Sequence, residues 1–511
     1  MNVILIKTLQ FLLCLSLLVV LHEGGHFGFA KLFKTRVTRF YMFANYGFHL
    51  FSSYDNWFRR LLGKPLITKR GSEGQNFFAW IRNKYYRLTG QGDKVVTENI
   101  GNKEYDPEVG TEYGIGWLPI GGYVAIDGMV DETHQKLSGE AKPWEFRSKP
   151  VWQRFLIMFG GVLMNLITAW VIYSLVLLAW GRDYYPMKSI EDGFQYNEQA
   201  HNIGFQDGDI PIAADGKEIV EYSSAVMRTI SNAKTITVLR QGEEVELKMP
   251  EEGLSMLKML QSQPQFLTPL AEAFIDSVVP GSAADKAGIE KGMRLMSVNG
   301  KEISTWADFD YEVTLRRQDV LSSPDCTRED SLKWRTLDAV VASADQSRTD
   351  TLHIQLDEKY MMGVTRHIPD YKTVHLDYNL ANCFPAGLSY GWRVLKSYVN
   401  DLKYVASADG AKSVGSFITI GNIFPDSWNW QQFWMLTAFI SIILAVMNIL
   451  PIPGLDGGHI VLLFYEGITG RQPSEKAMEW IEKIGLFIIL ALMILAMSND
   501  VRNFILPLFG L

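Results

Sequence analysis

The N-terminal part of this chain joins an apolar stretch to a cluster of polar residues. Residues 3–21 are almost wholly apolar and run directly into LHEGGHFGFA at residues 21–30. The length and hydropathy of residues 3–30 predict a membrane-spanning helix. Histidine and glutamate side chains are costly in hydrocarbon unless they face protein or a water-filled cavity. Polar groups at this depth therefore predict a functional site within the membrane.

The polar cluster has the spacing H-E-x-x-H. In a helix His22 and His26 lie one turn apart on one face. Both imidazoles can then bind one Zn²⁺, while Glu23 stands beside them as a general base. A chance match and a cleaved signal peptide are the alternatives. The apolar run is long and no A-x-A-like cleavage site follows it, which favours the zinc motif.

Composition excludes several classes of protein. The 511 residues include 47% apolar ones, which fits soluble modules combined with a few membrane spans. A net charge of −7 without a long basic cluster argues against a nucleic-acid partner. The three cysteines form no C-x-x-C motif, so a thiolate zinc site is not expected. Cys326 and Cys383 would pair only if both face an oxidising compartment.

Four segments have the composition of membrane spans, namely about 3–30, 155–180, 433–450 and 482–499. Basic residues follow the first segment closely and precede the second. The positive-inside bias therefore places the loop between them in the cytoplasm. Because spans alternate, we expect residues 181–432 and both termini outside the cytoplasm, with the zinc motif near the cytoplasmic face.

The cytoplasmic loop contains a Gly-rich, β-prone stretch, YGIGWLPIGGYVAI, at residues 113–126. We expect a membrane-associated β-hairpin, with Gly121 and Gly122 permitting close backbone approach. An ordinary surface hairpin is the alternative. Residues 50–112, which precede it, are polar and charged and are interpreted as an inserted region.

One pattern occurs twice between the second and third spans. Residues 275–303 predict a strand, a Gly-Ser loop, a short helix, and a strand that ends in an Asn-Gly turn. Residues 202–219 repeat part of this order in weaker form. The pattern resembles tandem PDZ domains, which bind extended peptides or the C-terminal ends of other proteins by strand addition. We expect the groove near Gly281–Ala284, with Ile275 beside it. A spacer without peptide binding is the alternative.

A third zinc ligand is needed beside the two histidines. Asp456 lies in MNILPIPGLDGGHIVLL, where prolines and glycines interrupt an otherwise spanning helix. Such breaks occur at membrane depth only where the freed backbone groups face protein or a water-filled cavity. Asp456 is therefore the expected ligand, with a helix cap in a plain loop as the alternative.

Three motifs together resemble the site-2 protease family of intramembrane zinc metalloproteases. They are H-E-x-x-H in the first span, G-x-x-x-N ending at Asn165, and N-x-x-P-x-P-x-L-D-G beginning at Asn448. The tandem PDZ insertion is similar to the bacterial sigma-E regulator protease branch, the RseP type. The resemblance implies zinc bound by His22, His26 and Asp456, with Glu23 as the base.

The resemblance also implies a substrate, a location and further site residues. Asn448, Asn165, Gly121 and Gly122 are expected to bind substrate. The substrate would be a single-pass membrane protein in the lipid bilayer of the bacterial inner membrane. It would be an anti-sigma factor already trimmed by another protease, or a remnant signal peptide. The periplasmic PDZ pair would exclude substrates with bulky external domains. The alternative function is a non-hydrolytic PDZ membrane scaffold.

Two departures from the family pattern concern the region around the site. The loop after the first span has Gly47, Phe48 and His49 where the branch has G-F-G. A lone histidine in a loop is most often a surface residue, and we expect this of His49. The stretch SVGSFITIG, before the third span, lacks the usual Gly-Pro.

The fold class expected is therefore a polytopic α-helical membrane protein with about four transmembrane helices, a membrane-associated β-hairpin and two inserted extracytoplasmic PDZ (α+β) domains. In sequence order the expected segments are a first transmembrane helix with the zinc motif (1–34), a cytoplasmic loop (35–154), a second transmembrane helix (155–180), two PDZ domains (190–267 and 268–362), an amphipathic membrane-surface region (380–430), a third transmembrane helix with the L-D-G motif (433–468) and a fourth (482–499).

Overall fold

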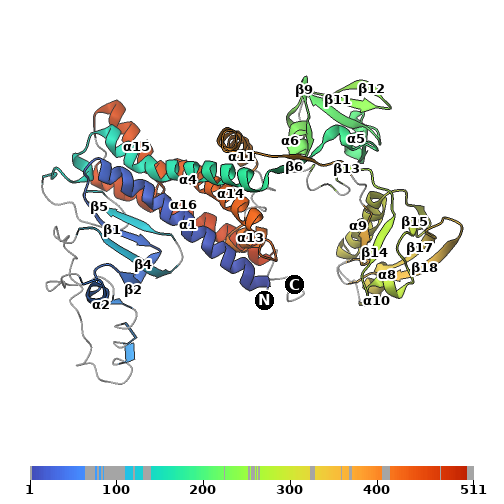
Figure 1. Cartoon of the computed structure of the whole chain (residues 1–511), viewed down its shortest axis with the longest axis horizontal. Coiled ribbons are helices and arrows are strands. Elements are labelled where there is room, and N and C mark those ends of the chain that lie inside the picture. Colours follow the sequence, from blue (N-terminus) through green and yellow to red (C-terminus); the bar gives the residue numbers. More distant parts are fainter. Residues whose placement is uncertain are drawn as a thin grey trace. The chain divides into compact units, whose positions relative to one another are not determined.

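The computed structural model of the protein divides into two compact units (Figure 1). One unit comprises Met1–Gly181 and Asp377–Leu511, and the other comprises Arg182–Leu376. The structure describes residues 3–63, 75–76, 80–81, 84–85, 110–118, 121–129, 140–223, 225–250, 254, 259, 262, 265–322, 328–357, 360–367, 371–405, 415–471 and 474–502. Most of the inserted region expected at 50–112, and Cys326, lie outside the described residues.

The first unit is built around helices long and apolar enough to cross a membrane. Among the described residues there are four such segments, α1 (Val3–Leu32), α4 (Val151–Trp180), α14 (Trp430–Ile449) and Lys483–Asp500 within α16 (Glu475–Asp500). The prediction of a membrane protein with about four apolar helices long enough to span is therefore confirmed. The second span begins four residues earlier than expected, at Val151, because Pro150 supplies the extended residue before the first turn.

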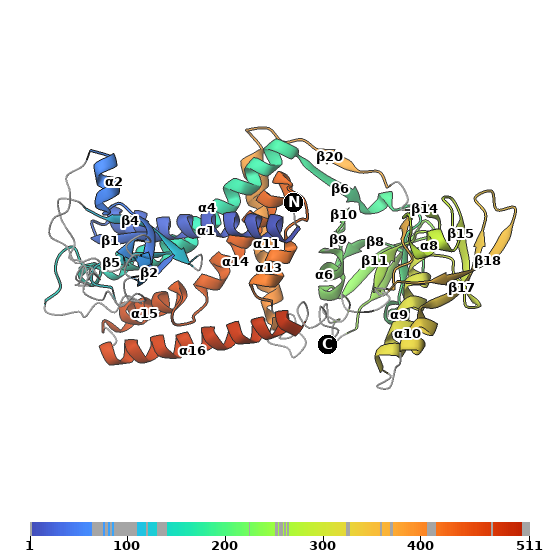
Figure 2. The same cartoon turned by 90° about the horizontal axis from the view of Figure 1, so that it is seen from below.

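The C-terminal half of α1 packs on the N-terminal half of α4, and the two helices diverge beyond this contact (Figures 1 and 2). Glycines allow this close approach. A Cβ placed on Gly160 would lie 2.7 Å from the carbonyl oxygen of Gly25 on α1. Helix α11 (Cys383–Val405) packs on the C-terminal half of α4, and there a Cβ on Gly387 would meet the backbone of Ser174. The Cys383 thiol at the start of α11 is buried and free.

A five-stranded sheet packs beside α1, and its strand order corrects the predicted hairpin. The strands are β1 (Val37–Met42), β2 (Ala44–Ser52), β3 (Gln75–Asn76), β4 (Glu112–Leu118) and β5 (Tyr123–Ile126), in the order β3-β2-β4-β1-β5. Strands β4 and β5 pair with opposite sides of β1, parallel and antiparallel respectively, and not with each other. The local Gly-rich pattern suggested a hairpin because the true partner, β1, comes from much earlier in the sequence.

His49 of strand β2 is buried, so the expectation of a surface residue is wrong. Its side chain is 3% exposed, and its Nε2 lies 2.9 Å from Oδ1 of Asp55. Asp55 stands just before helix α2 (Asn56–Leu61) and also accepts from the backbone N–H of Ser52 at 3.0 Å. A carboxylate six residues away thus gives the ring a polar partner and allows its burial.

The second unit contains the predicted repeat as two equivalent halves. The first runs α5 (Glu198–Ile203), β8 (Ile210–Ala214), β9 (Lys217–Glu218), α6 (Ala225–Asn232), β11 (Thr235–Arg240) and β12 (Glu243–Lys248). The second runs α8 (Ala283–Lys286), β15 (Arg294–Val298), β16 (Lys301–Glu302), α9 (Trp306–Ser322), α10 (Arg328–Arg335), β17 (Thr336–Ala342) and β18 (Thr349–Gln355). The sheet orders, β12-β11-β8-β9 and β18-β17-β15-β16, are the same. Each half has its own apolar core.

Short strands pair between the two halves and at the two ends of the unit. Strand β7 (Phe194–Tyr196) of the first half pairs with β13 (Leu267–Pro269), which leads into the second. The amide of Gln195 donates to Asp308 at 2.7 Å and accepts from the Thr305 hydroxyl at 2.6 Å. At the ends of the unit, β6 (Arg182–Pro186) pairs antiparallel with β20 (Val374–Leu376) and with β10 (Glu221–Tyr222).

Candidate active site

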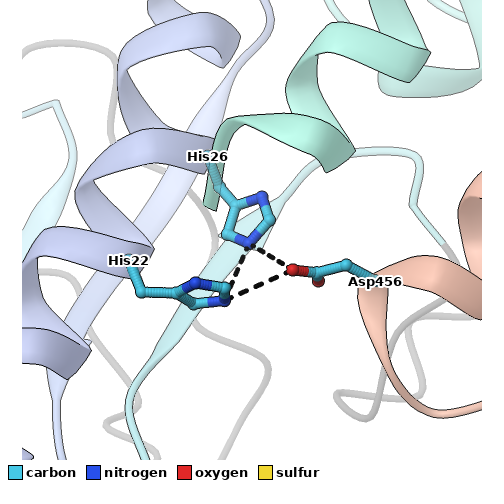
Figure 3. Close-up of side chains that lie close together, drawn as sticks. All are labelled: His22, His26 and Asp456. Carbon is cyan, nitrogen blue, oxygen red and sulfur yellow. Dashed lines mark hydrogen bonds and ion pairs between the residues drawn. The ribbon is translucent and has the colours of Figure 1, made fainter. Parts of the chain in front are cut away.

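Three side chains predicted to bind metal converge in the first unit (Figure 3). Helix α1 supplies His22 and His26, and Asp456 is the first residue of α15 (Asp456–Thr469). The two imidazole Nε2 atoms lie 3.3 Å apart. Oδ2 of Asp456 lies 3.3 Å from Nε2 of His22 and 3.4 Å from Nε2 of His26. Among the described residues, no other group of at least three such ligand side chains gathers in this way.

These distances match a tetrahedral zinc site. With bonds of about 2.0–2.1 Å, a tetrahedral ion separates its ligand atoms by about 3.3–3.4 Å. The three atoms therefore form one face of the required tetrahedron, and the fourth corner is left for a non-protein ligand. Oδ2 of Asp456 is buried and lacks a hydrogen-bond donor, as expected of a metal ligand. The donor set of two imidazoles and one carboxylate is typical of catalytic zinc.

Helix α4 orients both histidines. Nδ1 of His26 lies 2.8 Å from the carbonyl oxygen of Ile157, which leaves Nε2 to face Asp456. Nδ1 of His22 lies 3.2 Å from the amide nitrogen of Asn165. The Oδ1 atom of Asn165 is buried without a donor. Turning this amide by 180° lets Oδ1 accept from the imidazole Nδ1–H, the tautomer that leaves Nε2 of His22 available for a metal.

Gly161 on α4 leaves the room that the two imidazoles occupy. A Cβ at this position would lie 2.5 Å from Cε1 of His22 and would overlap Nε2 of His26. Any side chain would displace both rings. The sequence motif G-x-x-x-N contained this glycine, but only the packing shows why no larger residue fits.

The break between α14 and α15 delivers Asp456 to the histidines. Helix α14 ends at Ile449, and the backbone turns through the P-x-P segment before α15 begins. A Cβ on Gly457 would lie 2.5 Å from the carbonyl carbon of Ile449, so the turn is tightly folded on itself. Gly485 of α16 packs on Pro453, where a Cβ would lie 2.5 Å from the proline side chain. The predicted interruption of the third span is thus present and supported by protein.

Glu23 lies beside the start of strand β5. A Cβ on Gly122 would be 3.2 Å from Cγ of Glu23 and 2.7 Å from a methyl of Val19. The glycine therefore lets the sheet approach α1 at the predicted general base. Next to it, burial raises the pKa of Tyr123 to about 12, so its hydroxyl stays protonated at neutral pH.

The predicted substrate residues Asn165 and Asn448 both meet His22. The amide nitrogen of Asn448 lies 3.3 Å from Nε2 of His22, the atom that also faces Asp456. Asn448 therefore lies beside the ligand triangle, whereas Asn165 contacts the other nitrogen of the ring. The structure brings Gly122 to Glu23, while Gly121 has a positive φ of 70° at the preceding turn.

The predicted peptide groove of the second repeat is internally bonded. The N–H of Gly281 donates to Asp285 at 2.7 Å, and that of Ala284 donates to the carbonyl of Met362 at 2.9 Å. Ile275 is 1% exposed and belongs to the core, so it does not line a groove. Strand β14 (Ile275–Val278) pairs with β19 (Val364–Arg366).

Comparison with known proteins identifies the family. The model of peptidase family M50 matches residues 100–492, three quarters of the sequence. This chain belongs to peptidase family M50. Members are zinc-dependent site-2 proteases, so the protein is an intramembrane zinc metalloprotease. The predictions of a protease and of zinc are confirmed, and they displace the scaffold alternative.

Individual M50 proteases resemble the protein over almost its whole length. It is similar to the protease RseP of Yersinia pestis, at 26% identity covering 96% of this chain and 97% of the relative. The regulator of sigma-E protease RseP of Escherichia coli strain K12 shows the same identity and coverage. The regulator of sigma E protease of Haemophilus influenzae is 25% identical over 82% of this chain and 91% of the relative. The apolar helices and these relatives support an inner-membrane protein.

Proposed function

We propose that His22, His26 and Asp456 bind the catalytic Zn²⁺ of this M50 protease. The observation that carries the assignment is the triangle of ligand atoms with sides of 3.3, 3.3 and 3.4 Å. When bound, the ion lowers the pKa of a coordinated water to about 7 and polarises the substrate carbonyl. The protein supplies the geometry of the site, because α4 fixes the rings and the turned segment before α15 fixes the carboxylate.

Glu23 acts as the general base. It follows His22 directly on α1, so it stands beside the ligand triangle without belonging to it. Its carboxylate takes a proton from the attacking water and returns it to the leaving amine. Asn448, whose amide nitrogen lies 3.3 Å from Nε2 of His22, can donate an N–H to the substrate carbonyl.

The substrate is presented as an extended strand. A helical segment hides its scissile bond within its own hydrogen bonds, so it must be unwound before attack. Strand β5 pairs with β1 on one side only, and no described strand covers its other edge. That edge begins at Gly122, beside Glu23. Strand addition there would bring a peptide bond to the general base and the ligand triangle. The strand that offers this edge is β5, which pairs with β1 and does not form the hairpin predicted from the sequence.

The substrate class is a single-pass membrane protein within the bilayer. The relatives named as regulators of sigma E support an anti-sigma factor, and a remnant signal peptide has the same form of a single apolar helix. The basic residues flanking α1 and α4 support a zinc site near the cytoplasmic side, with the second unit in the periplasm.

The two repeats of the second unit are PDZ domains that restrict access by their bulk. Their common sheet order supports a tandem of one fold. Because the loop amides at Gly281 and Ala284 already have partners, size exclusion is favoured over capture of a C-terminal peptide. A short external tail would pass such a filter, whereas a folded external domain would not.

The function is tested with Glu23→Gln in the full-length protein. Purified variants are incubated in detergent with a single-pass substrate, and both cleavage and bound zinc are measured. Glu23→Gln should lose cleavage and keep about one zinc per molecule, since Glu23 is a base and not a ligand. His22→Ala and Asp456→Asn should lose the metal as well. Cleavage by Glu23→Gln at the parental rate would refute the assignment of the base.

A further inference from the structure

A buried ion pair joins α4 to the helix that carries Asp456. Arg154 of α4 and Glu466 of α15 form two parallel hydrogen bonds, Nη1 to Oε2 at 2.9 Å and Nη2 to Oε1 at 2.6 Å. Their side chains are only 8% and 12% exposed. Nε of Arg154 also donates to the carbonyl of Lys149 at 2.9 Å, which holds the guanidinium in place. This paired, fork-shaped contact is the most directional that the two side chains can make.

Both charges lie at helix ends that disfavour them. Arg154 is the fourth residue of α4, close to the positive end of the helix dipole. Glu466 is in the last turn of α15, at the negative end. Helix stability therefore does not account for either residue, and a buried ion pair is seldom a gain over apolar packing. The arrangement is explained if the pair fixes one helix against the other.

A small tilt of α15 at Glu466 produces a larger displacement at Asp456. Glu466 lies ten residues after Asp456 on one helix, so the two are about 15 Å apart along its axis. A tilt of about 10° about the Glu466 end would move the Asp456 end by roughly 2.5 Å, at 1.5 Å rise per residue. Between them, Ile460 and Leu463 pack on Met158 of α4. Apolar packing of this kind tolerates small rotations better than a two-pronged hydrogen bond does.

We propose that Arg154 and Glu466 are positioning residues for the zinc site. They fix α15 on α4, and thereby set the distance from the Asp456 carboxylate to the histidines, which α4 also orients. The positions of all three proposed ligands are then fixed by contacts with the same helix, α4. This inference rests on the proposed ligand set of His22, His26 and Asp456.

The test measures metal binding by the full-length protein in detergent micelles. Metal-free protein is titrated with Co²⁺, whose visible absorption reports tetrahedral coordination, and Zn²⁺ affinity is obtained by competition with a chelator. The variants are Arg154→Met and the exchange Arg154→Glu with Glu466→Arg. The matched control is Arg147→Met, which removes a nearby arginine that pairs with Glu145 at 2.6 Å outside the α4–α15 contact.

Arg154→Met should weaken Zn²⁺ binding and reduce the tetrahedral Co²⁺ signal, and the loss should not exceed the about 10- to 100-fold that removal of a direct partner of a ligand costs. The exchange variant should regain affinity to within a few-fold, because it restores the pair and puts each charge at its favoured helix end. Arg147→Met should bind as the parent does. Unchanged affinity and an unchanged spectrum in folded Arg154→Met would overturn the positioning role.

A further variant decides the case in which Arg154→Met does not fold. Arg154→Met with Glu466→Met removes both buried charges and keeps apolar bulk. Weakened binding by this folded double variant supports the role, and parental affinity refutes it. If the parent protein bound no metal and His22→Ala changed nothing, the proposed ligand set itself would be refuted. If the parent bound metal and substitution of Arg154 did not change the affinity, only the positioning role would be refuted.

Discussion

Substitution of a single hydrogen by a methyl group at Gly161 should abolish the metal site. The Cβ of Gly161→Ala would lie 2.5 Å from Cε1 of His22 and 2.8 Å from its Nδ1, and would overlap Nε2 of His26. Ordinary van der Waals contact begins near 3.4 Å. Both rings must therefore move by about 1 Å, whereas metal–ligand distances tolerate about 0.2 Å. We expect Zn²⁺ affinity to fall by at least about 100-fold, beyond the usual effect of an outer-shell change.

The assay for Gly161→Ala is zinc content after purification, followed by chelator competition. Gly28→Ala is the matched control, because it adds the same methyl to helix α1 two residues after His26, and nothing lies within 4 Å of its Cβ. The control should keep its zinc and gain slightly in helix stability. Gly161→Ala with one zinc per molecule and parental affinity would refute the reasoning from the ring positions.

Four further outcomes are expected. Asn165→Ala should weaken Zn²⁺ binding by about 10- to 100-fold in chelator competition, with Asn165→Asp retaining most of the affinity, and equal losses in both would argue against an orienting hydrogen bond. Gly122→Ala should keep zinc but lower kcat/KM, because the methyl pushes β5 from α1; an unchanged rate would remove β5 from the proposed presentation of substrate. Replacing residues 187–373 by a short Gly-Ser linker should permit cleavage of a substrate with an intact external domain, and continued restriction to trimmed substrate would contradict size exclusion. A cysteine at exposed Ser347 should react with an impermeant maleimide in spheroplasts while one at exposed Ser148 resists, and the reverse pattern would invert the proposed orientation.

The proposed ligand residues could be predicted because their signals are local. His22 and His26 follow from a four-residue spacing on a helix. Asp456 follows from a helix break, which occurs at membrane depth only where the freed backbone groups face protein or a water-filled cavity. The four spans follow from length and hydropathy alone. The repeat in the second unit was visible from the order of its turns, and the structure gives both halves the same sheet order.

The remaining features depend on partners far away in the sequence. Strand β5 was assigned to a hairpin because its neighbour β1 lies more than eighty residues earlier. Arg154 had the appearance of a solvated flanking charge, since its partner is 312 positions away. His49 was placed on the surface because nothing in the sequence marks Asp55 as its partner. Single-sequence periodicity reports which face of an element is buried, but not what lies against it.

The pairing of β6 with β20 joins the first and last strands of the second unit. Strand β6 leaves α4 directly after Trp180, and β20 leads within a few residues into α11. The two helices on either side of this unit in the sequence, α4 and α11, are also hydrogen-bonded. The indole of Trp170 on α4 donates to the carbonyl of Phe384 on α11. The second unit therefore begins and ends on one antiparallel ladder, so its chain starts and finishes at neighbouring residues.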